Sequence, residues 1–263
     1  MAEDILLRLA AHARERVDAA KRVLPPEELR ARALAMDCET GFPFERALAG
    51  DGIAFLCECK RASPSRGLIA PEFPYLDIAR EYEAAGAAAI SVLTEPKWFL
   101  GRDEYLRDIA AAVRIPCLRK DFTVDEYMLF EAKTLGASAV LLLCALLDTE
   151  TLRRYIGVCD TLGLSALVEA HDESEVASAA AAGARVIGVN NRNLRDFTVD
   201  LGNSARLRRL APQNALFVAE SGVRTAADVE TLRRCGADAV LVGEALMRAP
   251  DKTAALAELR GGL

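Results

Sequence analysis

Histidine is scarce in this chain of 263 residues, which contains only His12 and His171. Two histidines cannot build a histidine-rich metal site, so we expect no bound metal. Any acid–base chemistry is therefore expected to depend on lysine and glutamate. His171 itself is interpreted as a loop residue.

Long apolar runs are also missing. The longest stretch without a charged residue, Thr134 to Leu147, has 14 residues, whereas a membrane-spanning helix needs about 20. No basic, apolar leader opens the chain, so we expect neither a signal peptide nor a membrane anchor. The seven cysteines are an odd number without a regular framework, which favours reduced thiols in a cytoplasmic protein.

Basic residues do not cluster. The 33 lysines and arginines are scattered among 39 acidic residues, and the formal charge is −6; this pattern gives no support to a nucleic-acid surface. Hydrophobic residues make up 52% and charged residues 27%, which is typical of a globular protein with one large core. We expect a single domain, 1–263, that binds small molecules.

One short phrase occurs four times along the chain. In each copy a helix-like segment reaches a glycine that suits a left-handed C-terminal cap, and a run rich in β-branched residues or leucine follows. Each copy is typical of a joint from a helix to a strand. The copies begin at Ala85, Leu135, Ala182 and Cys235.

Eight short apolar runs are candidate strands. Each is followed by a helical pattern, and eight such units of about 25 residues match the roughly 250 residues of a (β/α)8 barrel. The polar segment 61–67 after the first run lacks the glycine-rich turn of a doubly wound sheet. The sequence therefore predicts an α/β fold, the (β/α)8 TIM barrel. The predicted strands are 54–59, 90–93, 115–118, 140–143, 165–168, 186–189, 216–219 and 240–242.

Residues 1–50 precede the first predicted strand as an N-terminal helical extension. Apolar residues recur at helical spacing from Ile5 to Ala20, and Pro25-Pro26 separate this helix from a second one near 27–35. We expect these helices to cap one end of the barrel or to cover a ligand.

Charged and polar residues follow several predicted strands at their carboxyl ends, where the chemistry of such barrels is found. Side chains alternate between strand faces, and alternate strands contribute inward layers. We therefore expect strands one, three, five and seven to bring their charges together in one ring at the mouth, where pKa values move apart. The candidates are Glu58, Lys60, Lys120, Glu169 and Glu220, with Asn190 and Arg192 from the sixth strand.

Small residues after the last two strands indicate a phosphate site. Ser221-Gly222 and Gly243-Glu244 each stand near a predicted helix start. Small residues let backbone N–H groups approach an anion, and loops seven and eight of these barrels are a frequent phosphate site.

In order along the chain, these residues resemble a known family, the indole-3-glycerol phosphate synthases of tryptophan biosynthesis. The resemblance covers nearly the whole chain, including the helical extension. It rests on the blocks Glu58 to Ser65, Leu93 to Glu95 with Phe99, Arg119 to Phe122, Leu167 to Glu169, Asn190 to Leu194, Ala219 to Gly222, and Val242 to Glu244.

The resemblance implies a lyase that closes the indole ring of 1-(2-carboxyphenylamino)-1-deoxyribulose 5-phosphate and releases CO2 and water without a cofactor. It implies that Lys120 is the general acid, that Glu169 is a base or electrostatic stabiliser, and that Lys60 contacts substrate and assists dehydration. A lysine can serve as the acid near neutral pH if burial and another cation lower its pKa. Supporting polar roles are implied for Glu58, Asn190 and Glu220.

The resemblance also implies where the substrate lies. Phosphate is held largely through the backbone at Ser221, Gly222, Gly243 and Glu244, whereas Arg192 and Ser63 lie near the carboxylate and in the first loop. The implied aryl pocket comprises Phe99, Phe122 and Leu141. No aromatic residue precedes Phe42, so we expect no aromatic contact from the first helix, which supplies one in some relatives. A monomer is the family's expectation.

Three other functions remain open at this stage. One is phosphoribosylanthranilate isomerase, which would use a cysteine and an aspartate at strand ends; no convincing pair is found. Another is a Schiff-base aldolase, which would form a borohydride-trappable adduct at Lys120. The third is a catalytically silent barrel that binds phosphorylated metabolites, whose signature would be the loss of Lys120 or Glu169; both are present.

Overall fold

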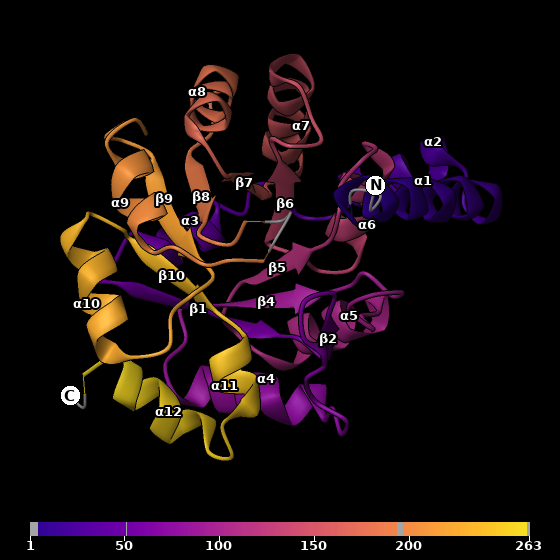
Figure 1. The fold of residues 1–263 in the computed structure, drawn as a ribbon. Helices are drawn as coiled ribbons and strands as arrows, with labels where there is room; N and C mark the ends of the chain where they lie inside the picture. The colour runs from indigo at the N-terminus through magenta and orange to yellow at the C-terminus, as the bar shows by residue number, and fades with distance from the viewer. Residues whose placement is uncertain (1–4, 51, 194–196, 262–263) are drawn as a thin grey trace.

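The computed structural model describes residues 5–50, 52–193 and 197–261. Eight parallel strands close into a barrel, in which each strand pairs with the next of the eight along the chain and β10 closes on β1 (Figure 1). The predicted (β/α)8 fold is confirmed. The barrel strands are β1 (Ala54–Cys59), β4 (Ala89–Leu93), β5 (Cys117–Lys120), β6 (Ala139–Leu143), β7 (Ser165–Ala170), β8 (Val186–Asn190), β9 (Leu216–Glu220) and β10 (Ala239–Val242).

Helices surround the barrel, and the four repeated glycines lie at the joints that lead into strands. Gly86, Gly136, Gly183 and Gly236 have φ between 82° and 88°, a conformation that costs glycine least. The helices outside the extension are α4 (Tyr75–Ala84), α5 (Asp103–Ala112), α6 (Tyr127–Thr134), α7 (Thr149–Leu162), α8 (Glu173–Ala182), α9 (Gly202–Arg208), α10 (Ala226–Arg234), α11 (Glu244–Arg248) and α12 (Lys252–Leu259).

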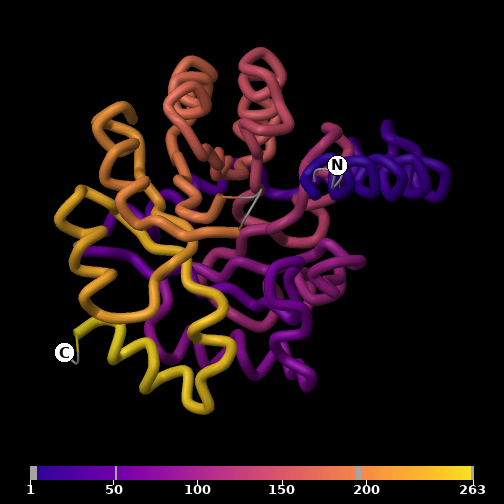
Figure 2. The backbone as a smooth tube through the Cα atoms, in the orientation of Figure 1, coloured from indigo at the N-terminus to yellow at the C-terminus, as the bar shows by residue number. Residues whose placement is uncertain are grey.

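The extension forms α1 (Ile5–Val23), α2 (Pro26–Leu34) and α3 (Pro43–Leu48), and it serves both ends of the barrel. Figure 2 shows α1 and α2 beside α6, and both helices contact it. Leu6 of α1 joins the apolar interior of the barrel at the mouth, while Phe44 and Leu48 of α3 are fully buried in the same cluster. Since α3 contacts β1 and β4, it closes the opposite end.

Alternation along the strands explains why charges gather at the mouth. Leu56, Leu118, Leu167 and Val218 point inward and belong to one apolar cluster. Two residues further along the same strands stand Glu58, Lys120, Glu169 and Glu220, which therefore point inward as well. The barrel interior is apolar below and charged in its top layer.

The third predicted strand was misplaced by two residues: 115–118 was expected, and Cys117–Lys120 is observed. The error arose because the strand contains two charged residues in sequence. Arg119 faces the helices and is buried, where Asp103 and Glu131 each accept from its Nη2 at 2.8 and 2.7 Å. None of the helices among the described residues is long and apolar enough to cross a membrane.

Candidate active site

A cavity of about 540 Å³ opens at the carboxyl ends of the strands. All of the predicted site residues line it, so the topology brings together residues from all eight barrel strands or the loops that follow them. They are Glu58, Lys60, Ser63, Phe99, Lys120, Phe122, Leu141, Glu169, Asn190, Arg192, Glu220, Ser221, Gly222, Gly243 and Glu244.

Lys120 occupies the centre of the ring. Its Nζ lies 2.8 Å from Oε2 of Glu169 and 3.1 Å from Oε2 of Glu220. The two carboxylates are almost completely buried, whereas 14% of the Lys120 side chain is exposed to the cavity. The ammonium group is therefore the accessible end of a buried cluster of opposite charges.

The condition that burial and another cation lower the pKa of the lysine is not met at Lys120. Burial does lower the pKa of Lys120, but the negative charges of Glu169, Glu220 and Glu58 outweigh burial and raise it above its ordinary value. None of the groups with the largest effects on the pKa of Lys120 is a cation. Lys120 therefore carries its proton throughout the neutral pH range.

The two glutamates beside Lys120 shift in opposite directions. Burial alone raises the pKa of Glu169, but Lys120 and His171 together bring it below the ordinary value. Burial raises the pKa of Glu220 above its ordinary value; Lys120 opposes this rise and the charge of Glu169 adds to it. The pKa shifts thus favour the ionised form of Glu169, while Glu220 holds a proton more readily.

Glu58 and Lys60 form a second pair at the end of β1. Lys60 Nζ donates to Glu58 Oε1 at 2.5 Å, and Ser91 Oγ donates to the other carboxylate oxygen at 3.3 Å. Space opposite this pair is small, because a Cβ at position 243 would lie 2.5 Å from Glu58 Oε1 and 3.0 Å from Lys60 Nζ. The loop after β10 therefore packs its backbone directly against the pair.

Asn190 connects the ring to the sixth loop. Its Nδ2 donates to Glu169 Oε1 at 3.0 Å, and its Oδ1 accepts from the backbone N–H of Arg192 at 3.0 Å. Arg192 Nη1 donates to the carbonyl oxygen of Phe197 at 3.2 Å, which keeps the guanidinium at the cavity wall. Leu194, the last residue of the sequence block that contains Asn190, lies outside the described residues.

The side of the cavity formed by the loops after β9 and β10 holds more positive charge than the sequence indicated. Ser221 and Gly222 turn back with φ of 65° and 97°, and Gly243 precedes α11. Glu244 accepts from Arg66 at 3.2 Å and from Arg248 at 3.3 Å. Three arginines that line the cavity here were not predicted from the sequence: Arg66, Arg224 and Arg248. Their positions could have indicated them, since each lies in or just after a loop in which substrate-binding residues were predicted.

Apolar side chains form the opposite wall. The rings of Phe99 and Phe122 have centroids 6.1 Å apart, and Leu141 lines the cavity from β6. The first helix contributes aliphatic side chains, Ile5, Leu6 and Leu9, in place of an aromatic one. Ser63 stands in β2 (Ala62–Ser63), which pairs with β3 (Gly67–Leu68) in a small hairpin after β1.

Comparison with known sequences decides the family. The sequence profile of indole-3-glycerol phosphate synthase matches residues 6–259. The chain belongs to the indole-3-glycerol phosphate synthase family.

Relatives in this family match over the full length. The indole-3-glycerol phosphate synthase of Ruminiclostridium cellulolyticum is 56% identical over 257 residues, which cover 98% of this chain and 99% of the relative. That of Lachnoclostridium phytofermentans is 46% identical, with coverage of 97% and 98%. The resemblance inferred from the ordered blocks is confirmed.

Solved structures of lower identity share the fold alone. The 3-hexulose-6-phosphate synthase of Salmonella typhimurium superposes with a TM-score of 0.66 at 15% identity and covers 80% of this chain and 97% of its own. Thiamine phosphate pyrophosphorylase of Pyrococcus furiosus gives 0.62 at 18% identity, with coverage of 82% and 96%. Both support the barrel assignment and carry no argument about substrate.

In this member of the indole-3-glycerol phosphate synthase family, α1 is fastened to the loops that follow β4 and β5. Glu95 Oε2 accepts from the backbone N–H groups of Trp98 and Phe99 at 2.8 and 3.0 Å. His12 lies 3.2 Å from the same carboxylate and meets the Trp98 ring edge-on at 5.5 Å. The helix thereby fixes the loop that carries Phe99.

His171 is a loop residue, as interpreted, but it also contacts the ring of charges. It stands in the bend after β7, and its Nε2 lies 3.3 Å from Glu169 Oε1. The available signal was its spacing, since residues two apart in an extended segment share a face. The described residues contain no group of three histidine, cysteine or acidic side chains placed to hold a metal ion.

Proposed function

We propose that this protein converts 1-(2-carboxyphenylamino)-1-deoxyribulose 5-phosphate to indole-3-glycerol phosphate, CO2 and water. The observation that carries the proposal is the placement of Lys120 between Glu169 and Glu220 at the floor of a cavity with an apolar wall on one side and arginines on the other. The substrate carries an aryl ring, which suits the apolar wall, and a carboxylate and a phosphate, which suit the arginines.

Ring closure is assigned to Lys120. The aryl carbon that carries the carboxylate attacks the ribulose carbonyl carbon, and the carbonyl oxygen takes the proton of the Lys120 ammonium as the new C–C bond forms. The raised pKa of Lys120, which arises from its carboxylate neighbours despite burial, ensures that the proton is present. A positioned acid of this kind typically contributes about 10²- to 10⁴-fold in rate.

Two eliminations complete the reaction. Loss of CO2 returns the bonding electrons to the ring and restores its aromaticity. Lys60 then protonates the departing hydroxyl group, while Glu169 removes a proton from the adjacent carbon, so that water leaves and the indole double bond forms. Glu58 holds Lys60 at 2.5 Å, and Asn190 holds Glu169 at 3.0 Å.

The remaining residues are assigned to binding. Backbone groups of Ser221, Gly222, Gly243 and Glu244 receive the phosphate, with positive charge from Lys60 and the nearby arginines. Arg192 and Ser63 are assigned to the carboxylate side and to the first loop. Phe99, Phe122 and Leu141 enclose the aryl ring, and the aliphatic residues of α1 complete that pocket.

The direct test is an assay of the purified protein with this substrate in the presence of EDTA. We expect an indole-fluorescent product and equimolar CO2. Absence of product would refute the proposed reaction, and loss of activity in EDTA would refute independence from metal. Treatment with borohydride and substrate separates the aldolase alternative, because only a Schiff base at Lys120 would leave a covalent adduct detectable by mass spectrometry.

We further propose that residues 1–263 act as one domain, as a monomer, in a reducing compartment such as the cytoplasm. All seven cysteines are free thiols, which supports a compartment without disulfide formation. Light scattering coupled to gel filtration should give a mass near 28.4 kDa; a concentration-independent dimer would refute the monomer.

A further inference from the structure

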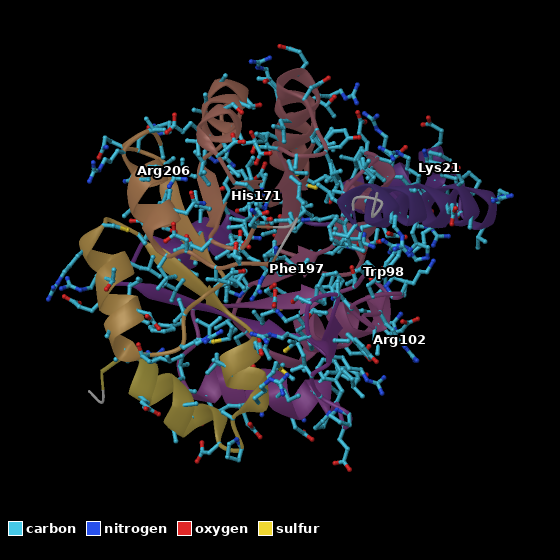
Figure 3. All side chains as sticks on the ribbon, in the orientation of Figure 1. Lys21, Trp98, Arg102, His171, Phe197 and Arg206 are labelled. Atoms are coloured by element: carbon cyan, nitrogen blue, oxygen red, sulfur yellow. The ribbon has the colours of Figure 1, made fainter. Side chains whose placement is uncertain are left out.

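His171 lies between two carboxylates and outside the cavity. Its Nδ1 is 3.1 Å from Oε2 of Glu175, and its Nε2 is 3.3 Å from Oε1 of Glu169. Glu175 also accepts from the backbone N–H of His171 at 2.7 Å. His171 does not line the cavity formed by the described residues, so it reaches the chemistry only through Glu169. Figure 3 shows His171 near the ends of β7 and β8.

Glu175 and the backbone of His171 are themselves fixed. Glu175 stands in the first turn of α8, where its backbone N–H donates to the capping Asp172 at 2.9 Å. The carbonyl oxygen of His171 accepts from Asn203 Nδ2 at 3.2 Å, and the same amide contacts the carbonyl oxygen of Asn190 at 3.3 Å. The bend after β7 is thus tied to α8, α9 and β8.

The charged groups that face His171 are acidic on every side. They are Glu169 from β7, Glu175 from α8, Glu220 from β9, and the adjacent Asp172. Burial lowers the pKa of His171, but the hydrogen bond to Glu175 and the charge of Glu169 raise it above its ordinary value. The imidazole placed between these carboxylates links α8 to the ring of charges.

We propose that His171 is a positioning residue for Glu169, held as an imidazolium by Glu175 so that the carboxylate stays ionised and oriented beside Lys120. The inference rests on the proposed role of Glu169 as base. Nothing in it requires His171 to touch substrate.

The kinetic test uses H171Q and E175Q, with E173Q as the matched control. Glu173 is exposed on the same turn of α8, so E173Q removes the same charge without touching His171. We expect kcat to fall about 10- to 100-fold in H171Q, the scale of a misoriented reacting group, with KM within about twofold. Because loss of the adjacent positive charge raises the pKa of Glu169, the acid limb of the kcat profile should move to higher pH.

A purely structural role would lower activity without moving that limb. An H171Q profile superimposable on that of the unmodified enzyme would overturn the proposal, as would an equal loss in E173Q. If H171Q fails to fold, E175Q still tests the proposal, because it removes the carboxylate that holds His171 and leaves the imidazole in place.

Histidine scarcity makes an independent measurement feasible. With only two imidazoles in the chain, ¹⁵N-labelled protein gives two pairs of ring nitrogen signals, and H12N assigns them. We expect His171 to titrate above the ordinary value of about 6.5 and E175Q to lower its pKa, with no change in E173Q. Titration at or below the ordinary value, unaffected by E175Q, would contradict the proposal.

The assay of E169Q separates the two levels of inference. If E169Q retains full activity, the proposed role of Glu169 fails, and the positioning role of His171 fails with it. If E169Q is inactive and H171Q behaves like the unmodified enzyme, only the assignment of His171 fails.

Discussion

Arg16 of α1 donates to both carboxylate oxygens of Asp121, with Nη–Oδ distances of 2.7 and 3.0 Å. Asp121 directly follows Lys120, and it also accepts from Thr94 Oγ1 at 2.7 Å. Burial raises the pKa of Asp121, but Arg16 more than reverses this and lowers it below its ordinary value. The extension is therefore joined by a buried ion pair to the backbone that presents the proposed acid.

Replacing Arg16 by alanine should weaken both stability and turnover. Asp121 is 1% exposed, so its charge would lose its main partner while remaining buried, which costs roughly 3 kcal/mol. We expect this loss in the free energy of unfolding by urea, together with a lower kcat. The exposed Arg22 of the same helix supplies the control, because R22A should change neither quantity. Equal behaviour of R16A and R22A would contradict the anchoring role.

Replacing Gly243 by alanine should impair catalysis more than stability. The added Cβ would meet the ends of two side chains, Glu58 and Lys60, which can move aside only by leaving their positions at the cavity. We expect kcat/KM to fall at least about tenfold, since small displacements of reacting groups have large effects. G157A is the control, because its Cβ meets no atom within 4 Å; it should keep full activity. Unchanged kcat/KM in G243A would argue against close packing at this pair.

Replacing Glu220 by glutamine should stabilise the protein at high pH. Burial raises the pKa of Glu220, and a carboxyl whose pKa is raised on folding loses stability as pH climbs from its ordinary pKa to its folded pKa. Glutamine has no such dependence, and Lys120 retains Glu169 as a partner. Near pH 8 we expect the Tm of E220Q to be a few degrees higher than that of the unmodified protein, since about 1 kcal/mol corresponds to 2–4 °C. Near pH 4.5 we expect the two proteins to have the same Tm. A difference in Tm that does not depend on pH would exclude this explanation.

Much of the site could be predicted because the barrel converts local patterns into a global arrangement. The positions of Glu58, Lys120, Glu169 and Glu220 follow from strand parity and from the rule that alternate strands share a layer. Once eight strands were recognised, their carboxyl ends had to meet at one mouth. The ring of charges could therefore be predicted without knowledge of any distance.

Other features depend on contacts between distant segments, which parity does not specify. Arg16 lies 105 residues from Asp121, and Arg66 lies 178 residues from Glu244; no local pattern pairs them. The direction in which the pKa of Lys120 shifts could not be predicted for the same reason. Burial was foreseeable from its strand, but the number of carboxylates within reach depends on the closed geometry of the barrel.

The account depends most directly on Lys120 as the acid. Its central test is the turnover of K120A with 1-(2-carboxyphenylamino)-1-deoxyribulose 5-phosphate, followed by indole fluorescence, alongside circular dichroism and the binding of inorganic phosphate. We predict a loss of at least about 10²-fold in kcat, with an unchanged spectrum and phosphate affinity largely retained. Full turnover by a folded K120A protein would contradict the account.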